Sequence, residues 1–459
     1  MEKLLEKAAE FLKKNDDFLV ICHYDADGLT SGAIMGLTLK RLGKKFEIMA
    51  SKALDDERIK KIKEKGKKNL IFVDLGSSTL EKIEDQLKEF NVLISDHHKP
   101  DKEKTFFLNV NPHYYGIDGA REISGAGVTY LIAKKVNEKN IDLAKIAIIG
   151  AVGDMQDKEG KLIGENRKIL KDAVKSGELI VKKDLRLYGR YSRPLTQFLA
   201  YSTDPFLPGL VGEEEECARF ITSLGIPLKK DDKWRCYADL SEDEKKRFAS
   251  AIYIYAKQHG LPEFVLKGMV GEVYELVKEK EPILKDAKEF ATLLNACGRH
   301  DKEEIGIKVA MGDRKEKFKE AAKMLAEHRR MLKEGIDLVK NNGIRETQWL
   351  YVVEFGDKVK DTIIGTIAGM LYSALIVGND KPVIALAIDP EGMIKISGRG
   401  TLDLVRQGLD LGKAMKKAAS EVGGAGGGHD VAAGARINPD KKEEFLKILD
   451  EEIKKQLSS

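Results

Sequence analysis

Short apolar runs alternate with amphipathic stretches along the first third of the chain, and this alternation constrains the fold more than any other feature of the sequence. The apolar runs, which we expect to form strands, are residues 18–22, 70–73, 92–94 and 146–150. The stretches with a helical spacing of apolar residues are residues 29–42, 55–65, 79–90 and 127–136. Alternation of strands and helices predicts an α/β fold, in which a parallel sheet carries helices on both faces.

Each of the four apolar runs is followed by acidic or histidine side chains. These residues are His23, Asp25, Asp27, Asp74, Asp96, His97, His98 and Asp154. Because ligands bind at the carboxyl ends of parallel strands, we expect these side chains to meet at one edge of the sheet. A single aspartate of this kind is as easily a turn or helix cap, but four such turns together favour a common site.

Carboxylates gathered at one edge repel one another unless cations neutralise them. Oxygen and imidazole ligands suit Mn²⁺ or Mg²⁺ better than ions that prefer thiolates. The set is large enough to hold two ions about 3.5–4 Å apart, which is the spacing of many phosphoryl-transfer sites. We therefore expect two divalent metal ions, Mn²⁺ or Mg²⁺, as cofactors.

Composition narrows the class of protein without identifying it. The length of 459 residues predicts two or three domains, and 42% hydrophobic with 34% charged residues is typical of a folded globular chain. The net charge of +4 permits a nucleic-acid partner without arguing for one. Four cysteines without a Cys-x-x-Cys pair, and an N-terminus without the apolar block of a signal peptide, predict a cytoplasmic location. The high content of Lys and Glu is typical of proteins from thermophilic organisms.

Changes in composition divide the chain into four expected parts. Residues 1–190 form the α/β domain with the acidic turns, and residues 191–285 form a charged, helical middle module, which we interpret as an insertion. Bridging helices occupy residues 286–340, and a smaller α/β domain occupies residues 341–459. The longest apolar stretch, residues 363–378, is interrupted by glycines and short for a membrane span, so we expect a buried helix and no membrane association.

Two further stretches have residues suited to binding phosphates. Residues 182–193 mix Lys and Arg with two tyrosines, a mixture typical of nucleic-acid contacts and equally of a solvated helix face. The glycine cluster Gly426, Gly427 and Gly428 leads into His429 and lacks the Lys-Ser/Thr that follows in a nucleotide P-loop. A flexible linker is the alternative, but backbone N–H groups without side chains approach phosphates closely.

The four acidic turns resemble, in order and spacing, the motifs of the DHH phosphoesterases. The correspondence covers the turn from His23 to Gly28, then Asp74, then Asp96-His97-His98, then Gly153-Asp154. The glycine cluster, with Ser397 and Arg399 upstream, resembles the DHHA1 domain, and residues 295–299 resemble the segment that bridges the two. The combination is similar to RecJ-type single-strand exonucleases, and most similar to the shorter archaeal members of that group.

The resemblance implies a role for each of these residues. The implied metal ligands are His23, Asp25, Asp27, Asp74, His97 and Asp154, with Asp74 bridging both ions. Asp96 is implied to orient an imidazole, and His98 to face the scissile phosphate as a hydrogen-bond donor. The implied substrate-binding residues are Ser397, Arg399, Gly426, Gly427, Gly428, His429, Asn295 and Arg299.

These observations lead to one expected function and two alternatives. We expect an exonuclease that degrades single-stranded nucleic acid by two-metal hydrolysis in DNA replication or repair. The resemblance implies that the substrate is DNA, digested in the 5′→3′ direction, and RNA is a further possible substrate. The first alternative is a DHH hydrolase of small substrates such as short oligonucleotides, cyclic dinucleotides or polyphosphate. The second is a replication scaffold that docks the GINS complex, as the resemblance to archaeal relatives implies. The middle module favours a polymeric substrate, and the intact acids argue against a purely structural role.

Overall fold

The computed structural model describes residues 1–202, 205–374 and 376–458, which form two compact units. The first unit comprises residues 1–202 and 207–325, and the second comprises residues 326–458 together with a short segment at 205–206. Helix α14 (Glu316–Asn342) contains the boundary between them.

The first unit is built on a five-stranded sheet in which all strands are parallel. The strand order is β2-β1-β3-β4-β5. The strands are β1 (Phe18–His23), β2 (Phe46–Ser51), β3 (Asn69–Val73), β4 (Asn91–Ser95) and β5 (Leu108–Val110). The chain leaves β1 toward β2 on one side and returns to β3 on the other, so the order reverses between β1 and β3. Open parallel sheets bind ligands at this switch point, beyond the carboxyl ends of the strands.

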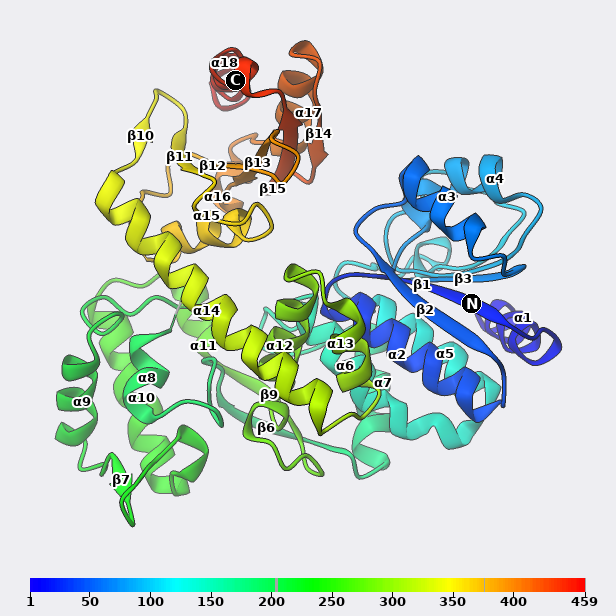
Figure 1. Ribbon diagram of the computed structural model, residues 1–459. Coiled ribbons are helices and arrows are strands. Elements are labelled where there is room, and N and C mark those ends of the chain that lie inside the picture. The colour runs from blue at the N-terminus through cyan, green and yellow to red at the C-terminus, as the bar shows by residue number, and fades with distance from the viewer. Residues whose placement is uncertain (203–204, 375, 459) are drawn as a thin grey trace. The chain divides into compact units, whose positions relative to one another are not determined.

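Helices cover both faces of this sheet, as predicted (Figure 1). The helices on one face are α1 (Glu2–Lys14), α2 (Ala26–Arg41) and α5 (Gly125–Val136), and those on the other are α3 (Asp56–Glu64) and α4 (Leu80–Leu87). Alternate residues of β1 enter the two cores, with Val20 and Cys22 on the α2 side and Leu19 and Ile21 on the α3 side. Strands buried on both faces are apolar throughout, which is why they were recognisable as continuous runs.

The expectation that residues 146–150 form a fourth strand is wrong. They belong to helix α6 (Ala144–Gly153), which packs on α2, α5 and α7 (Gly164–Lys175). Because α6 is buried all round, it has no polar stripe, and a short apolar run of this kind does not distinguish a helix from a buried strand. Asp154 therefore follows a helix rather than a strand.

The middle of the chain has a core of its own within the first unit. Strands β6 (Leu179–Leu185) and β9 (Val270–Leu276) form an antiparallel pair. Between them lie α8 (Leu195–Ala200), α9 (Glu214–Ser223), the hairpin β7 (Lys229–Lys230) and β8 (Lys233–Trp234), α10 (Glu242–Gln258) and α11 (Glu263–Met269). Helices α12 (Ala287–Arg299) and α13 (Glu303–Ala310) then lead to α14.

The basic stretch at residues 182–193 is not a surface helix, and its Arg190 is not available at the surface. Its first part belongs to β6, and Arg190 is only 2% exposed. The Arg190 guanidinium lies 2.6 Å from Asp184, 3.0 Å from Glu275 and 3.2 Å from Asp286. The sequence pattern could not reveal these partners, because two of them lie more than eighty residues further along the chain.

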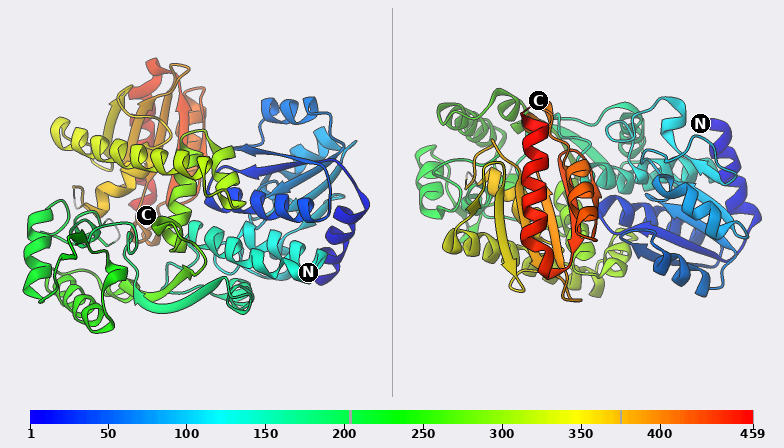
Figure 2. Two further views of the ribbon diagram at one scale, coloured as in Figure 1. Left: turned by 60° about the horizontal axis from the view of Figure 1, so that its bottom comes forward. Right: turned by 90° about the horizontal axis from the view of Figure 1, so that it is seen from above.

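The second unit is a six-stranded sheet with helices on both faces. The order is β10 (Arg345–Glu346), β11 (Tyr351–Gly356), β12 (Val383–Ile388), β13 (Ile394–Arg399), β15 (Ala432–Ile437) and β14 (Ala425–Gly428). Helices α17 (Leu411–Glu421) and α18 (Lys442–Leu457) lie side by side on one face (Figure 2). Helix α15 (Ile364–Ser373) and the end of α14 cover the other face, and α16 (Leu402–Arg406) follows β13. In the part of the chain that the structure describes, no helix has both the length and the apolar composition to cross a membrane.

Candidate metal centre

The turns after β1, β3 and β4 bring carboxylate and imidazole groups together at the switch point of the first sheet, where Asp154 also arrives from α6. Three groups of side chains have potential ligand atoms within 4.8 Å of one another. They are Asp74 with His97 and His98, His23 with Asp25 and Asp74, and Asp27 with His97 and Asp154. Since Asp74 and His97 each belong to two groups, the cluster is continuous. It contains all six side chains expected to be ligands, and their binding of metal remains a prediction.

Backbone N–H groups orient the acids of the turn after β1. Asp25 caps α2 by accepting a hydrogen bond from the Gly28 N–H at 3.0 Å, and its other oxygen lies 2.9 Å from Nδ1 of His23. Asp27 is 2% exposed and accepts from two backbone N–H groups at the start of α5, at 2.7 and 3.0 Å. The N-termini of α2 and α5 therefore both face the cluster, where their dipoles stabilise negative charge.

Asp74 lies in a strained turn directly after β3. Its φ of 60° is in the left-handed region, which costs a residue with a Cβ about 1–2 kcal/mol. The Asp74 N–H donates to the Ser95 carbonyl of β4 at 2.9 Å, which holds the turn in place. A Cβ on Gly125 would lie 2.4 Å from Oδ1 of Asp74, so only glycine at that position leaves room for the carboxylate. Strain concentrated at a buried acid is typical of a functional site.

The atoms that face each other between His97 and Asp74 are suited to a cation. Nδ1 of His97 lies 2.7 Å from the Gly119 carbonyl, so Nδ1 carries a proton, and Nε2 presents a lone pair whenever the ring is neutral. Nε2 lies 3.2 Å from Oδ1 of Asp74, and both atoms are buried without a hydrogen-bond partner among the described residues. Two lone pairs directed at each other are stable only when a proton or a metal ion lies between them. The donor set therefore fits a divalent ion that accepts oxygen and imidazole ligands.

Asp96 and His98 form a second arrangement beside the cluster. Asp96 is fully buried and accepts from the backbone N–H groups of Ser77, His97 and His98 at 2.8, 2.8 and 3.1 Å. It also lies 2.8 Å from Nδ1 of His98. Although burial opposes the charge, these contacts keep the pKa of Asp96 below its ordinary value. Burial lowers the pKa of His98, but Asp96 outweighs it and raises that pKa to about 9. His98 is therefore a cation at neutral pH, with Nε2 available as a donor.

Burial and crowding shift the pKa values of Asp74 and Asp154 upward. Burial, followed by the charges of Asp27 and Asp25, raises the pKa of Asp74 well above its ordinary value. Burial also raises the pKa of Asp154 to about 6. For His97, burial lowers the pKa, but the carboxylates of Asp154 and Asp27 outweigh it and raise the pKa to about 8. Protons thus neutralise the same atoms that a metal ion would neutralise, and metal binding is linked to proton release.

Gln156 is a residue of the site that the sequence reasoning missed. It is 6% exposed, and its Nε2 donates to Oδ2 of Asp154 at 2.8 Å and to the Gly119 carbonyl at 2.8 Å. The same carbonyl orients the ring of His97. Oε1 of Gln156 accepts from Nδ2 of Asn166 at 2.5 Å. One buried amide thus positions two of the expected ligands, and only its place two residues after Asp154 could have drawn attention to it.

The two expected substrate-binding residues of α12 are in different situations. Oδ1 of Asn295 accepts a hydrogen bond from the Ala26 N–H at 2.9 Å, so its carbonyl oxygen supports the turn between Asp25 and Asp27. Arg299 is the last residue of α12. The close approach of α12 to this turn is also visible at Gly298, where a Cβ would lie 1.9 Å from the Tyr24 carbonyl. Contact of either residue with substrate remains a prediction.

The remaining expected substrate-binding residues lie together in the second unit. Ser397 and Arg399 belong to β13, and Ser397 is in register with Gly434 of β15, which is in register with Gly427 of β14. The glycine cluster is therefore an edge strand rather than a loop or linker, and His429 follows it as an exposed residue. The Arg399 guanidinium donates to the Ser397 hydroxyl at 3.3 Å and to the Gly398 carbonyl at 2.8 Å.

The parallel sheet has aspartates and histidines clustered at its switch point, and the models of three known domains match the chain. The DHH family, N-terminal domain, matches residues 17–152, the DHH-CID domain matches residues 187–270, and the DHHA1 domain matches residues 347–455. An uncharacterized protein of Methanocaldococcus jannaschii is 35% identical over 474 residues, which cover 100% of this chain and 99% of that protein. The chain belongs to the RecJ-like DHH superfamily of phosphoesterases.

More distant relatives resemble parts of the chain or its fold. The single-stranded-DNA-specific exonuclease RecJ of Bacillus subtilis is 26% identical over 166 residues, which cover 34% of this chain and 21% of that enzyme. The structure of RecJ from Thermus thermophilus in complex with Mn²⁺ has a TM-score of 0.61 at 18% identity, covering 99% of this chain and 55% of that one. CDC45 from Entamoeba histolytica has a TM-score of 0.68 at 16% identity, covering 100% and 98%. At these identities the two structures share the fold alone with this chain.

Proposed function

We propose that this protein is a divalent-metal-dependent phosphodiesterase that removes nucleotides from an end of single-stranded nucleic acid, with DNA in the 5′→3′ direction as the first substrate to test and RNA as the second. The observation that carries the proposal is the buried pair of unpartnered atoms, Nε2 of His97 and Oδ1 of Asp74, within a continuous cluster of six potential ligands. Such a cluster is stable only when protons or metal ions neutralise it, and a divalent ion would satisfy both unpartnered atoms at once.

In this proposal the cluster holds two ions, Mn²⁺ or Mg²⁺. Asp74 would be shared by both ions, His23 and Asp25 would hold one of them, and His97, Asp27 and Asp154 would hold the other. When bound, divalent ions supply an activated water and neutralise charge on the phosphoryl oxygens.

The neighbouring residues position the cluster and the phosphate. Asp96 holds the ring of His98 through Nδ1, so that the protonated His98 donates from Nε2 to a phosphoryl oxygen as negative charge develops. The Gly119 carbonyl keeps the proton of His97 on Nδ1 and leaves Nε2 as a ligand. The nucleic-acid strand would be held in the second unit by Ser397, Arg399, His429 and the exposed backbone of β14.

Support for a nucleic-acid substrate comes from the relatives. The Bacillus subtilis protein that matches a third of this chain is named as a single-stranded-DNA-specific exonuclease, and the Thermus thermophilus RecJ with the same fold binds Mn²⁺. The matches to DHH-CID and DHHA1 domains add a substantial surface beyond the catalytic domain, which favours a polymer over a dinucleotide.

Digestion of end-labelled oligonucleotides tests the proposal. Single-stranded DNA and RNA labelled at the 5′ or the 3′ end are incubated with Mn²⁺ or Mg²⁺, beside an Asp74→Asn variant that keeps the shape of the side chain. We expect stepwise products from one end with the wild type and none with the variant, while Asp85→Asn on the exposed side of α4 acts as the wild type. Hydrolysis of dinucleotides alone would favour the small-substrate alternative, and full activity of a folded Asp74→Asn variant would refute the metal assignment.

The likeness to the CDC45 fold favours a second candidate function, a docking role in a replication complex. Docking through the middle module does not need the acids, so a GINS-type complex should bind the Asp74→Asn variant and the wild type equally. A binding assay with purified GINS separates the two functions. Equal binding together with hydrolysis by the wild type would assign both roles, and the absence of binding would count against docking.

A further inference from the structure

A charged groove lies in the first unit where the segment after Asp154 meets β6 and β9. Its volume is about 460 Å³. Four lysines line it, namely Lys161, Lys182, Lys183 and Lys267, together with Glu159 and Glu272. The lysines come from three separate segments, the loop before α7, strand β6 and helix α11, and only the tertiary structure assembles them.

The groove has a surplus of positive charge. Glu159 and Glu272 do not neutralise the lysines, because each is paired with an arginine outside the lining, Arg121 and Arg167 respectively. Lys182 has a partner in Glu275 at 2.6 Å. Lys267 lies 4.0 Å from Glu263 of the same helix. The side chains of Lys161, Lys183 and Lys267 are exposed, which leaves their ammonium groups accessible to a ligand.

The walls of the groove are held rigidly to one another. The Gly160 carbonyl accepts a hydrogen bond from the Glu272 N–H of β9 at 2.8 Å, and a Cβ on Gly271 would lie 2.4 Å from the same carbonyl. The Arg186 guanidinium, just after β6, donates to the Asp157 carbonyl at 2.7 Å and to its carboxylate at 2.6 Å. The loop at residues 155–161 is therefore fixed against the two strands.

The same loop connects the groove with the candidate metal centre. A smaller hollow lined by Met155, Gln156 and Lys158 shares Glu159 and Lys161 with the groove. Gln156 in turn donates to Asp154 in the cluster. The loop at residues 155–161 thus links the cluster to the groove, and Lys158 adds an exposed basic side chain to it.

We propose that this groove binds the phosphate backbone of a single-stranded polynucleotide at nucleotides beyond those held at the metal centre. The inference rests on the proposed function and extends it, since it makes a polymer rather than a dinucleotide the preferred substrate. Among the described residues that line the groove none is aromatic, so it contacts phosphates and not base faces. Binding in the groove is therefore independent of sequence and strongly dependent on salt.

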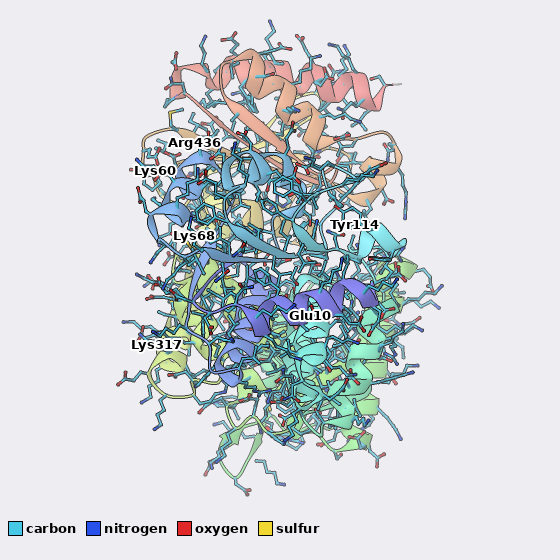
Figure 3. All side chains as sticks on the ribbon, turned by 90° about the vertical axis from the view of Figure 1, so that its right-hand side faces the viewer. Glu10, Lys60, Lys68, Tyr114, Lys317 and Arg436 are labelled. Carbon is cyan, nitrogen blue, oxygen red and sulfur yellow. The ribbon has the colours of Figure 1, made fainter. Side chains whose placement is uncertain are left out.

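The test compares two double variants that change charge equally. Lys161→Glu with Lys183→Glu alters the groove, and Lys60→Glu with Lys63→Glu alters exposed lysines of α3, where Figure 3 labels Lys60. The probes are a fluorescent oligothymidylate of about 20 nucleotides and a thymidine dinucleotide, since single-strand sites span about 4–16 nucleotides. Binding is measured by anisotropy with a chelator present, over a series of salt concentrations, and hydrolysis of both probes is measured with Mn²⁺.

We expect the groove variant to bind the long probe at least tenfold more weakly and the α3 variant to bind it as the wild type does. Replacing both lysines by Gln, which removes rather than reverses charge, should reduce the slope of log K against log salt by about 1.4, because each phosphate contact contributes about 0.7 for single strands. Hydrolysis of the dinucleotide should be unchanged in every folded variant. The Gln variants also give a result if the Glu variants fail to fold.

The outcomes separate this inference from the proposed function. The proposal that the groove binds the polynucleotide is overturned if the slope of log K against log salt is the same in the wild type and the Gln variant. It is also overturned if the groove variant and the α3 variant lose binding equally. If the wild type binds the long probe through the groove and hydrolyses neither probe, the proposed function fails and the groove stands. If the wild type hydrolyses both probes and the groove variant behaves as the wild type does, the proposed function stands and only the binding role of the groove is refuted.

Discussion

Replacing Gln156 with Met tests how the metal centre is positioned. The substitution keeps the volume of the side chain and removes its amide, which donates to Asp154 at 2.8 Å, to the Gly119 carbonyl at 2.8 Å and to the Ile123 carbonyl at 3.3 Å. Asp154 loses the contact that sets its orientation, and the Gly119 carbonyl loses one of the two donors that fix it beside His97. Both effects act on expected ligands without removing either of them.

The structure sets the size of the two expected effects. Groups that orient metal ligands typically contribute about 10–100-fold to metal affinity, which corresponds to about 1.4–2.8 kcal/mol. Folding is also affected, because Nδ2 of Asn166 loses the acceptor that lies 2.5 Å away and is itself almost fully buried. An unsatisfied buried amide costs about 1–3 kcal/mol, so the free energy of unfolding of the metal-free protein should fall by that amount.

Two measurements separate these effects. Titration calorimetry with Mn²⁺ gives the affinity, and denaturant unfolding in the presence of a chelator gives the stability. Asn166→Ala is the matched variant, since it leaves the Gln156 amide able to donate to Asp154, and we expect it to lower stability with a smaller loss of affinity. Gln258→Met, at the exposed end of α10, controls for the change in side-chain type. An unchanged Mn²⁺ affinity in folded Gln156→Met would refute the positioning role.

Two further predictions concern the metal centre, and a third concerns the second unit. Gly125→Ala places a Cβ 2.4 Å from Oδ1 of Asp74. Calorimetry should therefore show at least tenfold weaker Mn²⁺ binding, and denaturant unfolding should show a loss of about 1–3 kcal/mol in the free energy of unfolding. Gly369→Ala is the control and should be tolerated, because nothing lies within 4 Å of the new Cβ. Mn²⁺ affinity should rise from pH 5.5 to about pH 8.5, because Asp154 with a pKa of about 6 and His97 with a pKa of about 8 must lose protons to bind metal. Calorimetry in buffers of different ionisation enthalpy measures the released protons, and an affinity independent of pH would contradict the linkage. His429→Ala should raise KM for oligonucleotides severalfold and leave Mn²⁺ affinity unchanged, and equal loss of both would contradict a substrate-binding role.

The sequence by itself was sufficient for three strands of the parallel sheet and for the residues that follow them, but it did not mark β2 or β5. Strands β1, β3 and β4 are buried on both faces, so hydrophobicity alone marks them, and the turn residues that follow must meet because parallel strands end at the same side. The aspartates and histidines could therefore be grouped before any contact was known. The same reasoning failed at residues 146–150, where a helix buried on all sides and a buried strand have the same apolar composition.

Only the tertiary structure decided which polar groups serve the site and how. Gln156 is significant because its amide reaches oxygens of two other segments, and the burial of Arg190 depends on carboxylates distant in sequence. The left-handed turn at Asp74 and its dependence on Gly125 likewise result from the packing of α5 against the end of β3. Local patterns report burial and periodicity, whereas hydrogen bonds and charge pairs are formed between segments that meet only when the chain has folded.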